Sequence, residues 1–248
     1  MTDSNIKRSL KLTRVETEGF KQIKTPVLLA DSKGTYIENE ITDPEKFGIK
    51  FINHSGTTLR ASILWITKHF QKRTKRHKII HVHVWLGTCD ITKKANGFIE
   101  LRYEKTEVLL SYLKDKFEDI ILAKLESRKK HKPTISLLEV PHYSLVLYNR
   151  RQKHEDPQSF YEADLKLAKQ IDAVNQLIQK FNSDLATRSP KFPLHLTRPT
   201  KGHKKGKGTK AHSHYNFKDV YIDGIHPSPL LAKLCTTYRK TNHSRLLC

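Results

Sequence analysis

The stretch that decides the fold is PVLLADSKG, residues 26–34. Its first five residues form a short apolar run, and the next four are typical of a turn. A short apolar run bounded by turn residues predicts a strand that is buried on both faces. Parallel sheets contain such strands because helices cover both of their faces. We therefore expect residues 26–30 to form a buried strand that ends in a tight turn at residues 31–34.

Alternating strands and helices follow this segment. Runs rich in apolar residues predict three further strands, at residues 48–53, 78–86 and 134–140. Apolar residues at helical spacing predict helices at residues 58–70, 103–129 and 162–185. A fifth strand at residues 190–196 contains Pro193, which is compatible only with an edge position. The alternation predicts an α/β fold, a three-layer doubly wound and mostly parallel sheet of flavodoxin-like type.

Three predicted loops lie where strands end. They contain Ser32, Gly56 and Cys89, and each follows a predicted strand. The carboxyl ends of parallel strands meet at one edge of the sheet, where ligands bind in such folds. Residues that are far apart in the sequence are therefore expected to meet at this edge.

The composition excludes several classes of protein. A chain of 248 residues is compatible with one domain that has a sizeable core. The charged fraction of 29% and the mean hydropathy of -0.61 exclude a membrane-embedded protein. No signal-peptide-like run is found, and the three cysteines lack CxxC spacing, so neither a disulfide framework nor a structural zinc site is expected. These features favour an intracellular protein, cytoplasmic or nuclear, with no membrane span.

The chain is strongly basic, with 46 Lys and Arg residues against 25 Asp and Glu residues and a net charge of +21. Residues 188–214 contain basic residues and no acidic one. RNA or DNA is a candidate partner because cations that contact phosphates release counterions. The candidate binding residues are Lys201, Lys204, Lys205, Lys207 and Lys210. The run at residues 72–78 is a second basic patch, which is equally compatible with a solvated helix end.

The chain divides into segments by composition. Residues 1–25 form a polar N-terminal extension, and residues 26–240 form the predicted domain. A Gly/Lys/His-rich insertion at about residues 198–214 has no apolar side chain with which to build a core. Residues 241–248 are a C-terminal tail.

Two motifs resemble those of the SGNH/GDSL hydrolase family. The segment VLLADSKG, residues 27–34, resembles the family's nucleophile block, in which Gly-Asp-Ser follows the first strand, although Ala30 replaces the Gly. The segment YIDGIHP, residues 221–227, contains the Asp-x-x-His of the family's last block. The resemblance implies that Ser32 is the nucleophile, that His226 is its general base and then acid, and that Asp223 orients the imidazole.

The resemblance also implies an oxyanion hole formed by Ser32, Gly56 and Cys89. Asn53-His54-Ser55-Gly56 resembles the family's Gly block, although Gly56 is equally compatible with an ordinary turn. Gly87-Thr88-Cys89-Asp90 resembles the Asn block, with Cys89 in the position of the Asn. A thiol is a weaker donor than an amide N–H, so turnover is expected to be slow. Cys89 is alternatively a second nucleophile or an inert buried thiol, and the inert thiol is the simpler interpretation.

Two alternating histidines are a further, weaker candidate site. His81 and His83 share one face of a predicted strand with Trp85 and could in principle share a metal ion. No acidic or cysteine partner is evident, so packed core histidines are the preferred interpretation. Neither a metal nor an organic cofactor is expected.

Three functions are compatible with these features. The first is a serine esterase of SGNH type that acts on a small-molecule acyl ester. The second is a catalytically degenerate SGNH-like scaffold that binds nucleic acid through its basic surface, as SGNH-like domains occur in the first-open-reading-frame proteins of some retroelements. The third is an inactive interaction module, because a fold does not fix a function.

Overall fold

The structure is a computed structural model that describes residues 25–41, 48–74, 80–127, 133–189, 197–199, 213–215, 217–233 and 235. Five predictions lie wholly or largely outside these residues. They are the N-terminal extension, the second basic patch at residues 72–78, the fifth strand at residues 190–196, the basic loop from Lys201 to Lys210, and the C-terminal tail.

A four-stranded parallel sheet forms the centre of the molecule. Its strands are β2 (Lys50–Asn53), β1 (Thr25–Ala30), β3 (Ile80–Trp85) and β6 (Thr134–Leu137), in that order. All three strand pairs are parallel. The α/β class, the parallel sheet and the four strands expected within the described residues are therefore confirmed.

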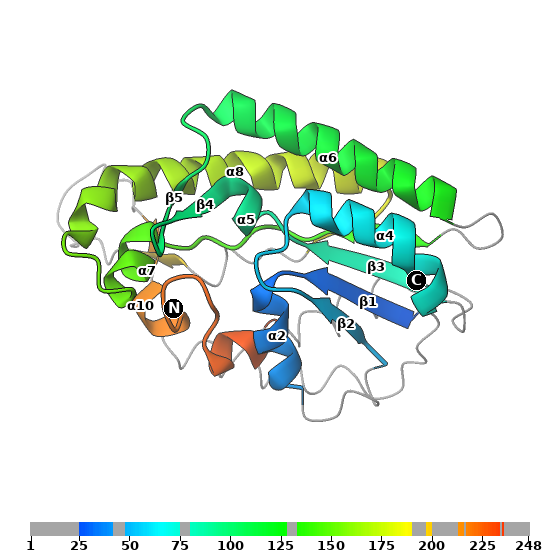
Figure 1. The fold of residues 1–248 in the computed structure, drawn as a ribbon, viewed down its shortest axis with the longest axis horizontal. Helices are drawn as coiled ribbons and strands as arrows, with labels where there is room; N and C mark the ends of the chain where they lie inside the picture. Colours follow the sequence, from blue (N-terminus) through cyan, green and yellow to red (C-terminus); the bar gives the residue numbers. More distant parts are fainter. Residues whose placement is uncertain are drawn as a thin grey trace.

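Helices cover both faces of this sheet, so the domain has three layers (Figure 1). On one face lie α4 (Leu59–Thr74), α6 (Thr106–Ser127) and α8 (Tyr161–Asp184). On the other face lie α2 (Ser32–Asn39) and a turn of helix at residues 229–233. This is the doubly wound arrangement that the alternation of strands and helices predicts.

Strand β1 shows why both faces are closed. Val27 and Leu29 pack into the larger apolar cluster, beneath the three long helices. Leu28 and Ala30 point the other way and pack into the smaller cluster with Ile37 of α2. Side chains alternate between faces along a strand, so an unbroken apolar run is the pattern of a strand covered on both sides.

Asparagine side chains satisfy backbone groups at and beyond the end of β6. Asn182 Oδ1 accepts from the Leu137 N–H at 2.9 Å, and Asn182 Nδ2 donates to the Leu137 carbonyl. Seven residues earlier on α8, Asn175 makes the same pair of bonds with Val140. A buried peptide group without partners is costly, so these amides stabilise the segment where β6 ends.

Three local predictions need correction. Residues 31–34 do not form a tight turn, because α2 begins at Ser32 and contains Gly34. The loop expected at residues 87–90 contains a one-turn helix, α5 (Thr88–Ile91), which leads into a hairpin of β4 (Thr92–Ala95) and β5 (Phe98–Leu101). The fourth strand ends at Leu137 rather than at Val140.

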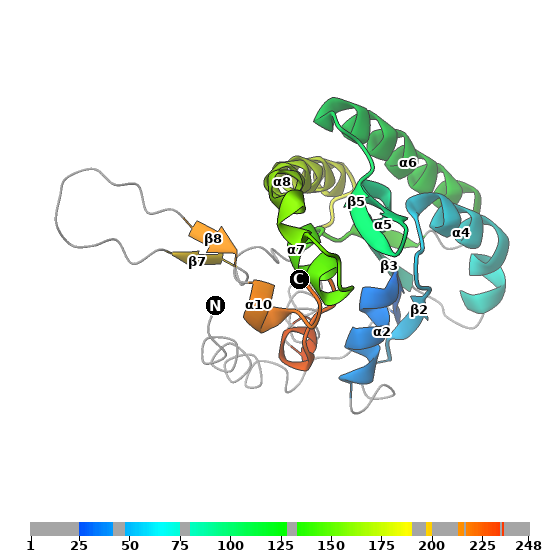
Figure 2. The same ribbon diagram turned by 60° about the vertical axis from the view of Figure 1, so that its left-hand side comes forward.

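Smaller elements connect the main ones. They are α7 (Leu145–Arg151), the 3-10 helix η2 (Pro157–Phe160) and α10 (Phe217–Val220). The short strands β7 (Thr197–Pro199) and β8 (Ser213–Tyr215) pair with each other and lie apart from the central sheet (Figure 2). Among the described helices, none is long and apolar enough to cross a membrane.

Candidate functional site

Ser32 lies at the junction between β1 and α2. Asp31 is the N-cap of α2, and its Oδ1 accepts from the Lys33 N–H at 3.0 Å. The Gly34 N–H donates to the Asp31 carbonyl at 3.0 Å. The Ser32 N–H has no acceptor among the described residues and lies at the positive end of the helix dipole.

Gly34 allows α2 to lie close to the sheet. A Cβ atom at this position would be 2.2 Å from Asn53 Oδ1 and 2.7 Å from the Cβ of Ala30. Real Cβ contacts are not this short, so a larger residue would push the first turn of α2 away from β2. The glycine two residues after Ser32 thus sets where the serine hydroxyl lies.

His226 and Asp223 lie in a closed loop at residues 221–227. A β-bridge joins Tyr221 and Pro227 at the two ends of the loop. The Ile222 N–H donates to the His226 carbonyl at 2.8 Å across the loop. The loop is therefore held as a unit that carries both side chains.

Gly224 fits this loop against the start of α7. Its φ is +96°, a conformation that L side chains rarely adopt. A Cβ atom here would lie 2.8 Å from Leu147 Cβ and 2.9 Å from the Tyr148 nitrogen. The Ser144 N–H donates to the Gly224 carbonyl at 3.0 Å. Both the conformation and the close approach require glycine.

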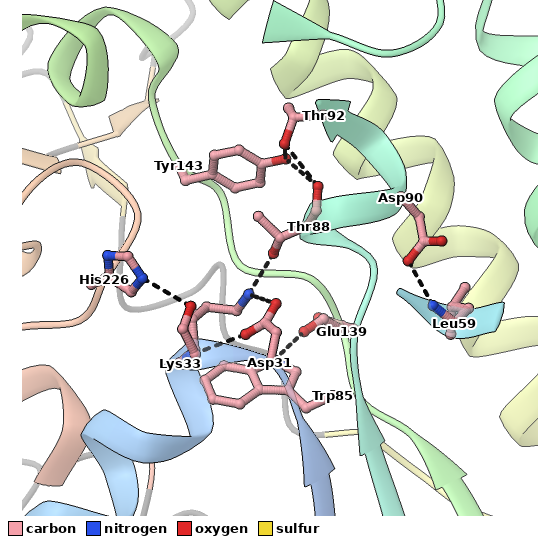
Figure 3. Close-up of polar contacts among 11 residues, drawn as sticks. Asp31, Lys33, Leu59, Trp85, Thr88, Asp90, Thr92, Glu139, Tyr143 and His226 are labelled. Carbon is pink, nitrogen blue, oxygen red and sulfur yellow. Dashed lines mark hydrogen bonds and ion pairs between the residues drawn. The ribbon is translucent and has the colours of Figure 1, made fainter. Parts of the chain in front are cut away.

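The structure brings Ser32, His226 and Asp223 together. Ser32 Oγ lies 2.9 Å from His226 Nε2, although the two residues are 194 positions apart. His226 Nδ1 lies 2.7 Å from Asp223 Oδ2. Figure 3 shows His226 at the edge of the cluster around Asp31, with its contact drawn as a dashed line. In this arrangement Nδ1–H donates to the carboxylate, and Nε2 is left to accept the serine proton.

Asp223 is held as a carboxylate. Burial raises the pKa of Asp223, but hydrogen bonds from the His226 ring and from two backbone N–H groups outweigh it and leave the pKa below its usual value. These N–H groups belong to His226 and Ile225, and both donate to Asp223 Oδ1. One carboxylate oxygen therefore fixes the loop while the other fixes the imidazole.

Two tyrosines surround this pair. The Tyr36 ring stacks on the His226 ring, with centroids 4.9 Å apart and an interplanar angle of 30°. Tyr36 lies one helical turn after Ser32 on α2, so both residues face His226. Burial, followed by the charge of Asp223, raises the pKa of Tyr148 on α7, so its hydroxyl stays protonated near the carboxylate.

The loop at the end of β3 is built around Asp90. Its Oδ2 accepts from the Leu59 N–H at 3.0 Å, which caps the start of α4, and its Oδ1 accepts from the Tyr112 hydroxyl at 3.0 Å. Burial raises the pKa of Asp90 despite these bonds. Gly87, with φ +119°, starts the turn. Asp90 thus holds the Cys89 loop against two helices and is a structural residue.

Cys89 is partly exposed rather than fully buried. Burial of the thiol, followed by the charge of Asp31, raises the pKa of Cys89 to about 11. The charge of Lys33 also acts on it, so the thiol lies near the residues that flank Ser32. A thiol with this pKa stays protonated at neutral pH, which disfavours its interpretation as a second nucleophile and leaves its S–H available as a donor.

The comparisons with known proteins concern the fold. No protein-family model matches the chain, and no curated protein matches it. Among solved structures, a GDSL-like lipase from Bacteroides thetaiotaomicron is similar, with a TM-score of 0.56 and 14% identity over 99% of this chain and 100% of that one. A putative acylhydrolase from Bacteroides fragilis gives a TM-score of 0.58 and 13% identity over 100% of both chains.

A third similar structure is LAE5, an alpha/beta hydrolase enzyme from the metagenome of Lake Arreo, with a TM-score of 0.52 and 13% identity over 92% of this chain and 98% of that one. The chain has an SGNH/GDSL-hydrolase fold. The likeness covers 92–100% of this chain. Within the chain, Ser32 follows the first strand, β1, and begins α2.

Gly56, the second expected donor in this SGNH/GDSL fold, lies in an exposed turn after β2. Its φ is +73°, and a Cβ atom there would meet nothing within 4 Å. The turn is tied to the site edge, because the His54 N–H donates to the Ala30 carbonyl at 3.2 Å. The role of Gly56 as an oxyanion donor stays a prediction.

His81 and His83 are packed core residues. They stack at 4.1 Å between ring centroids, and His81 Nε2 lies 2.5 Å from Ser136 Oγ. Both side chains are buried in the face of the sheet opposite the three long helices. Within the described part of the chain, no group of three metal-ligating residues occurs.

Sequence reasoning missed two polar residues at this site, Lys33 and Thr88. Lys33 directly follows Ser32 and is 3% exposed, and its ammonium group contacts Thr88 at the end of β3. A lysine in a turn-like sequence is ordinarily solvated, so nothing in its local pattern indicated burial. The only available signal was its position between Ser32 and Gly34.

Proposed function

We propose that this chain is a serine hydrolase that cleaves an acyl ester through an acyl-Ser32 intermediate. The proposal rests on one observation, the relay in which Ser32 Oγ lies 2.9 Å from His226 Nε2 while His226 Nδ1 lies 2.7 Å from Asp223 Oδ2. A serine hydroxyl becomes a nucleophile when an oriented base takes its proton. The SGNH/GDSL fold, which the chain shares with acylhydrolases, supports the same reaction class.

Acylation begins when Ser32 Oγ attacks the carbonyl carbon of the ester. His226 Nε2 takes the hydroxyl proton, and the resulting imidazolium donates to Asp223, which remains ionised. The tetrahedral intermediate then collapses and its bond to the alcohol oxygen breaks. The alcohol leaves with the proton from Nε2, and the acyl group stays on Ser32.

Deacylation repeats these steps with water. His226 Nε2 takes a proton from the water as its oxygen attacks the acyl carbon. The bond between the carbonyl carbon and Ser32 Oγ breaks, and Oγ recovers the proton. The carboxylic acid leaves, and the enzyme returns to its starting state without a cofactor.

The developing oxyanion needs donors at the edge where Ser32 lies. We assign this role to the Ser32 N–H at the start of α2, the Gly56 N–H and the Cys89 thiol. Loss of one good donor costs about 10²–10³ in turnover in a reference serine protease. A thiol is a weak donor, so the chain is expected to hydrolyse esters slowly.

The test compares variants on a short activated ester, p-nitrophenyl acetate, and with a fluorophosphonate probe. Ser32→Ala is expected to abolish both hydrolysis and labelling, and His226→Ala is expected to reduce both to a similar degree because the two residues act as a unit. Ser159→Ala, which removes an exposed hydroxyl on η2, is the matched control and should behave as the wild type. Equal activity in the wild type and Ser32→Ala would refute the proposal.

A second candidate function, nucleic-acid binding, rests on charge. Residues 188–214 contain eight Lys and Arg residues and no acidic residue. Replacement of Lys204, Lys205, Lys207 and Lys210 by Gln is expected to weaken binding of RNA or DNA and, on duplex DNA, to reduce the log–log salt slope by up to about 3.6. Ester hydrolysis should be unaffected. No filter binding by the wild type at about 50 mM salt would dismiss this function.

A further inference from the structure

Lys33 is a buried cation directly beside the nucleophile. Its side chain is 3% exposed, whereas lysines are rarely buried. The ammonium group contacts Asp31 Oδ2 and Thr88 Oγ1, and it lies 5.7 Å from the centroid of the Trp85 ring. Figure 3 shows the lysine between Asp31 and Thr88. Burial of the Lys33 ammonium group is costly, so its contacts must compensate for the loss of water.

Asp31 binds Lys33 twice. Its Oδ1 accepts from the Lys33 backbone N–H, and its Oδ2 accepts from the Lys33 ammonium group. The first bond caps α2, and the second neutralises the buried carboxylate. Two contacts therefore join Asp31 and Lys33, the residues that precede and follow Ser32 in the sequence.

Thr88 connects this pair to a different strand end. It is the first residue of α5 and directly precedes Cys89. Its carbonyl accepts from the Thr92 hydroxyl at 2.8 Å, and its own hydroxyl accepts from Lys33. A displacement of Thr88 would therefore carry Cys89 with it.

Stability alone does not account for this arrangement. Burying two charges is costly, and well-packed apolar residues are often as stable or more stable in their place. Apolar side chains at both position 31 and position 33 would avoid that cost, whereas loss of Lys33 alone would leave the buried Asp31 carboxylate unpaired. Lys33 instead connects Asp31, which precedes Ser32, with Thr88, which precedes Cys89.

We propose that Lys33 is a positioning residue that fixes the distance between the nucleophile Ser32 and the Cys89 thiol. Its ammonium group joins Asp31, which precedes Ser32, to Thr88, which precedes Cys89. This inference rests on the proposed hydrolase function. It assigns Lys33 no contact with substrate and no proton transfer.

The test uses Thr88, because Thr88→Val keeps the shape of the side chain and the Asp31–Lys33 pair while removing the acceptor. We expect kcat on p-nitrophenyl acetate to fall by about 3- to 10-fold with KM within about twofold, because the contact positions the Cys89 thiol, a weaker donor than the amide whose loss costs about 10²–10³. Thr88→Ser retains the hydroxyl and should recover most of the wild-type kcat. Thermal unfolding of each variant shows that it is folded.

Lys33→Met and the Lys33→Met/Thr88→Val double variant complete the cycle. If both residues act through one contact, the double variant should have the same kcat as Lys33→Met within about twofold. A wild-type kcat in Thr88→Val, or multiplicative losses in the double variant, would overturn the positioning role while the hydrolase function stands. A wild type that neither hydrolyses the ester nor labels at Ser32 would overturn the hydrolase function itself, and this inference with it.

Discussion

Gly224→Ala is the sharpest probe of how the loop at residues 221–227 is held. The added Cβ atom has two costs. An alanine with φ near +96° is strained by about 1–2 kcal/mol. The same atom would lie within 3.0 Å of Leu147, Tyr148 and Ser144, and overpacking of this kind costs about 1–3 kcal/mol. The loss in the free energy of unfolding is therefore about 2–5 kcal/mol.

Gly97→Ala provides the matched control. Gly97 has a similar φ of +89°, but a Cβ atom there would meet nothing within 4 Å, so only the conformational cost applies. A domain of this size loses about 2–4 °C in Tm per kcal/mol. By circular dichroism, Gly224→Ala should therefore melt about 2–12 °C below Gly97→Ala, and only Gly224→Ala should lose ester hydrolysis. Equal melting temperatures would refute the packing of this loop on α7.

Three further predictions concern the site. Asp223→Asn should lower kcat by mis-setting the His226 tautomer. The same substitution should also lower the free energy of unfolding at neutral pH, because the pKa of Asp223 is depressed in the folded state. This contribution of the Asp223 carboxylate to stability should disappear as the pH falls below about 4. Urea unfolding of both proteins from pH 7 to pH 3 measures this. Tyr36→Leu should lower kcat by about 3- to 10-fold, because the ring faces the imidazolium that forms, whereas Tyr36→Phe should keep the wild-type rate; equal rates in all three would remove Tyr36 from the site. Cys89→Asn should raise kcat by up to about 10²-fold, and an unchanged rate in a variant that still labels at Ser32 would mean that position 89 is not an oxyanion donor.

The strands of the sheet were predictable because their apolar runs are local. Residues 26–30 are apolar throughout, and β1 is buried on both faces as that pattern requires. The start of α2 was not predictable in the same way. The segment SKGTYIEN has Gly34 in its first turn, which costs about 1 kcal/mol in a helix, and it has little apolar periodicity. The helix forms there because Asp31 caps it and Gly34 packs against Asn53.

The hairpin of β4 and β5 was not predicted, although the sequence contains a signal for it. Asn96 and Gly97 both have positive φ and join β4 to β5 through a two-residue loop. Asn-Gly between two strand-like segments is a strong local signal for such a turn, so the sequence contained the information. Asn149 then ties β5 to α7 through the backbone of Ile99. That contact spans 50 residues and could not be read from either segment alone.

In the candidate site, too, one contact between residues that are close in the sequence was predictable, and one contact between distant residues was not. Asp223 and His226 are three residues apart, so their spacing allows a contact, and in the structure Asp223 Oδ2 lies 2.7 Å from His226 Nδ1. The contact of Lys33 with Thr88 joins residues 55 positions apart and arises only because β1 and β3 are neighbours in the sheet. The pKa of Cys89 depends on the same neighbourhood, since burial and the charge of Asp31 keep its proton in place. The sequence alone left Cys89 open as a nucleophile, an inert thiol or a donor. In the folded chain the raised pKa disfavours the nucleophile. The rate of Cys89→Asn distinguishes the donor from the inert thiol.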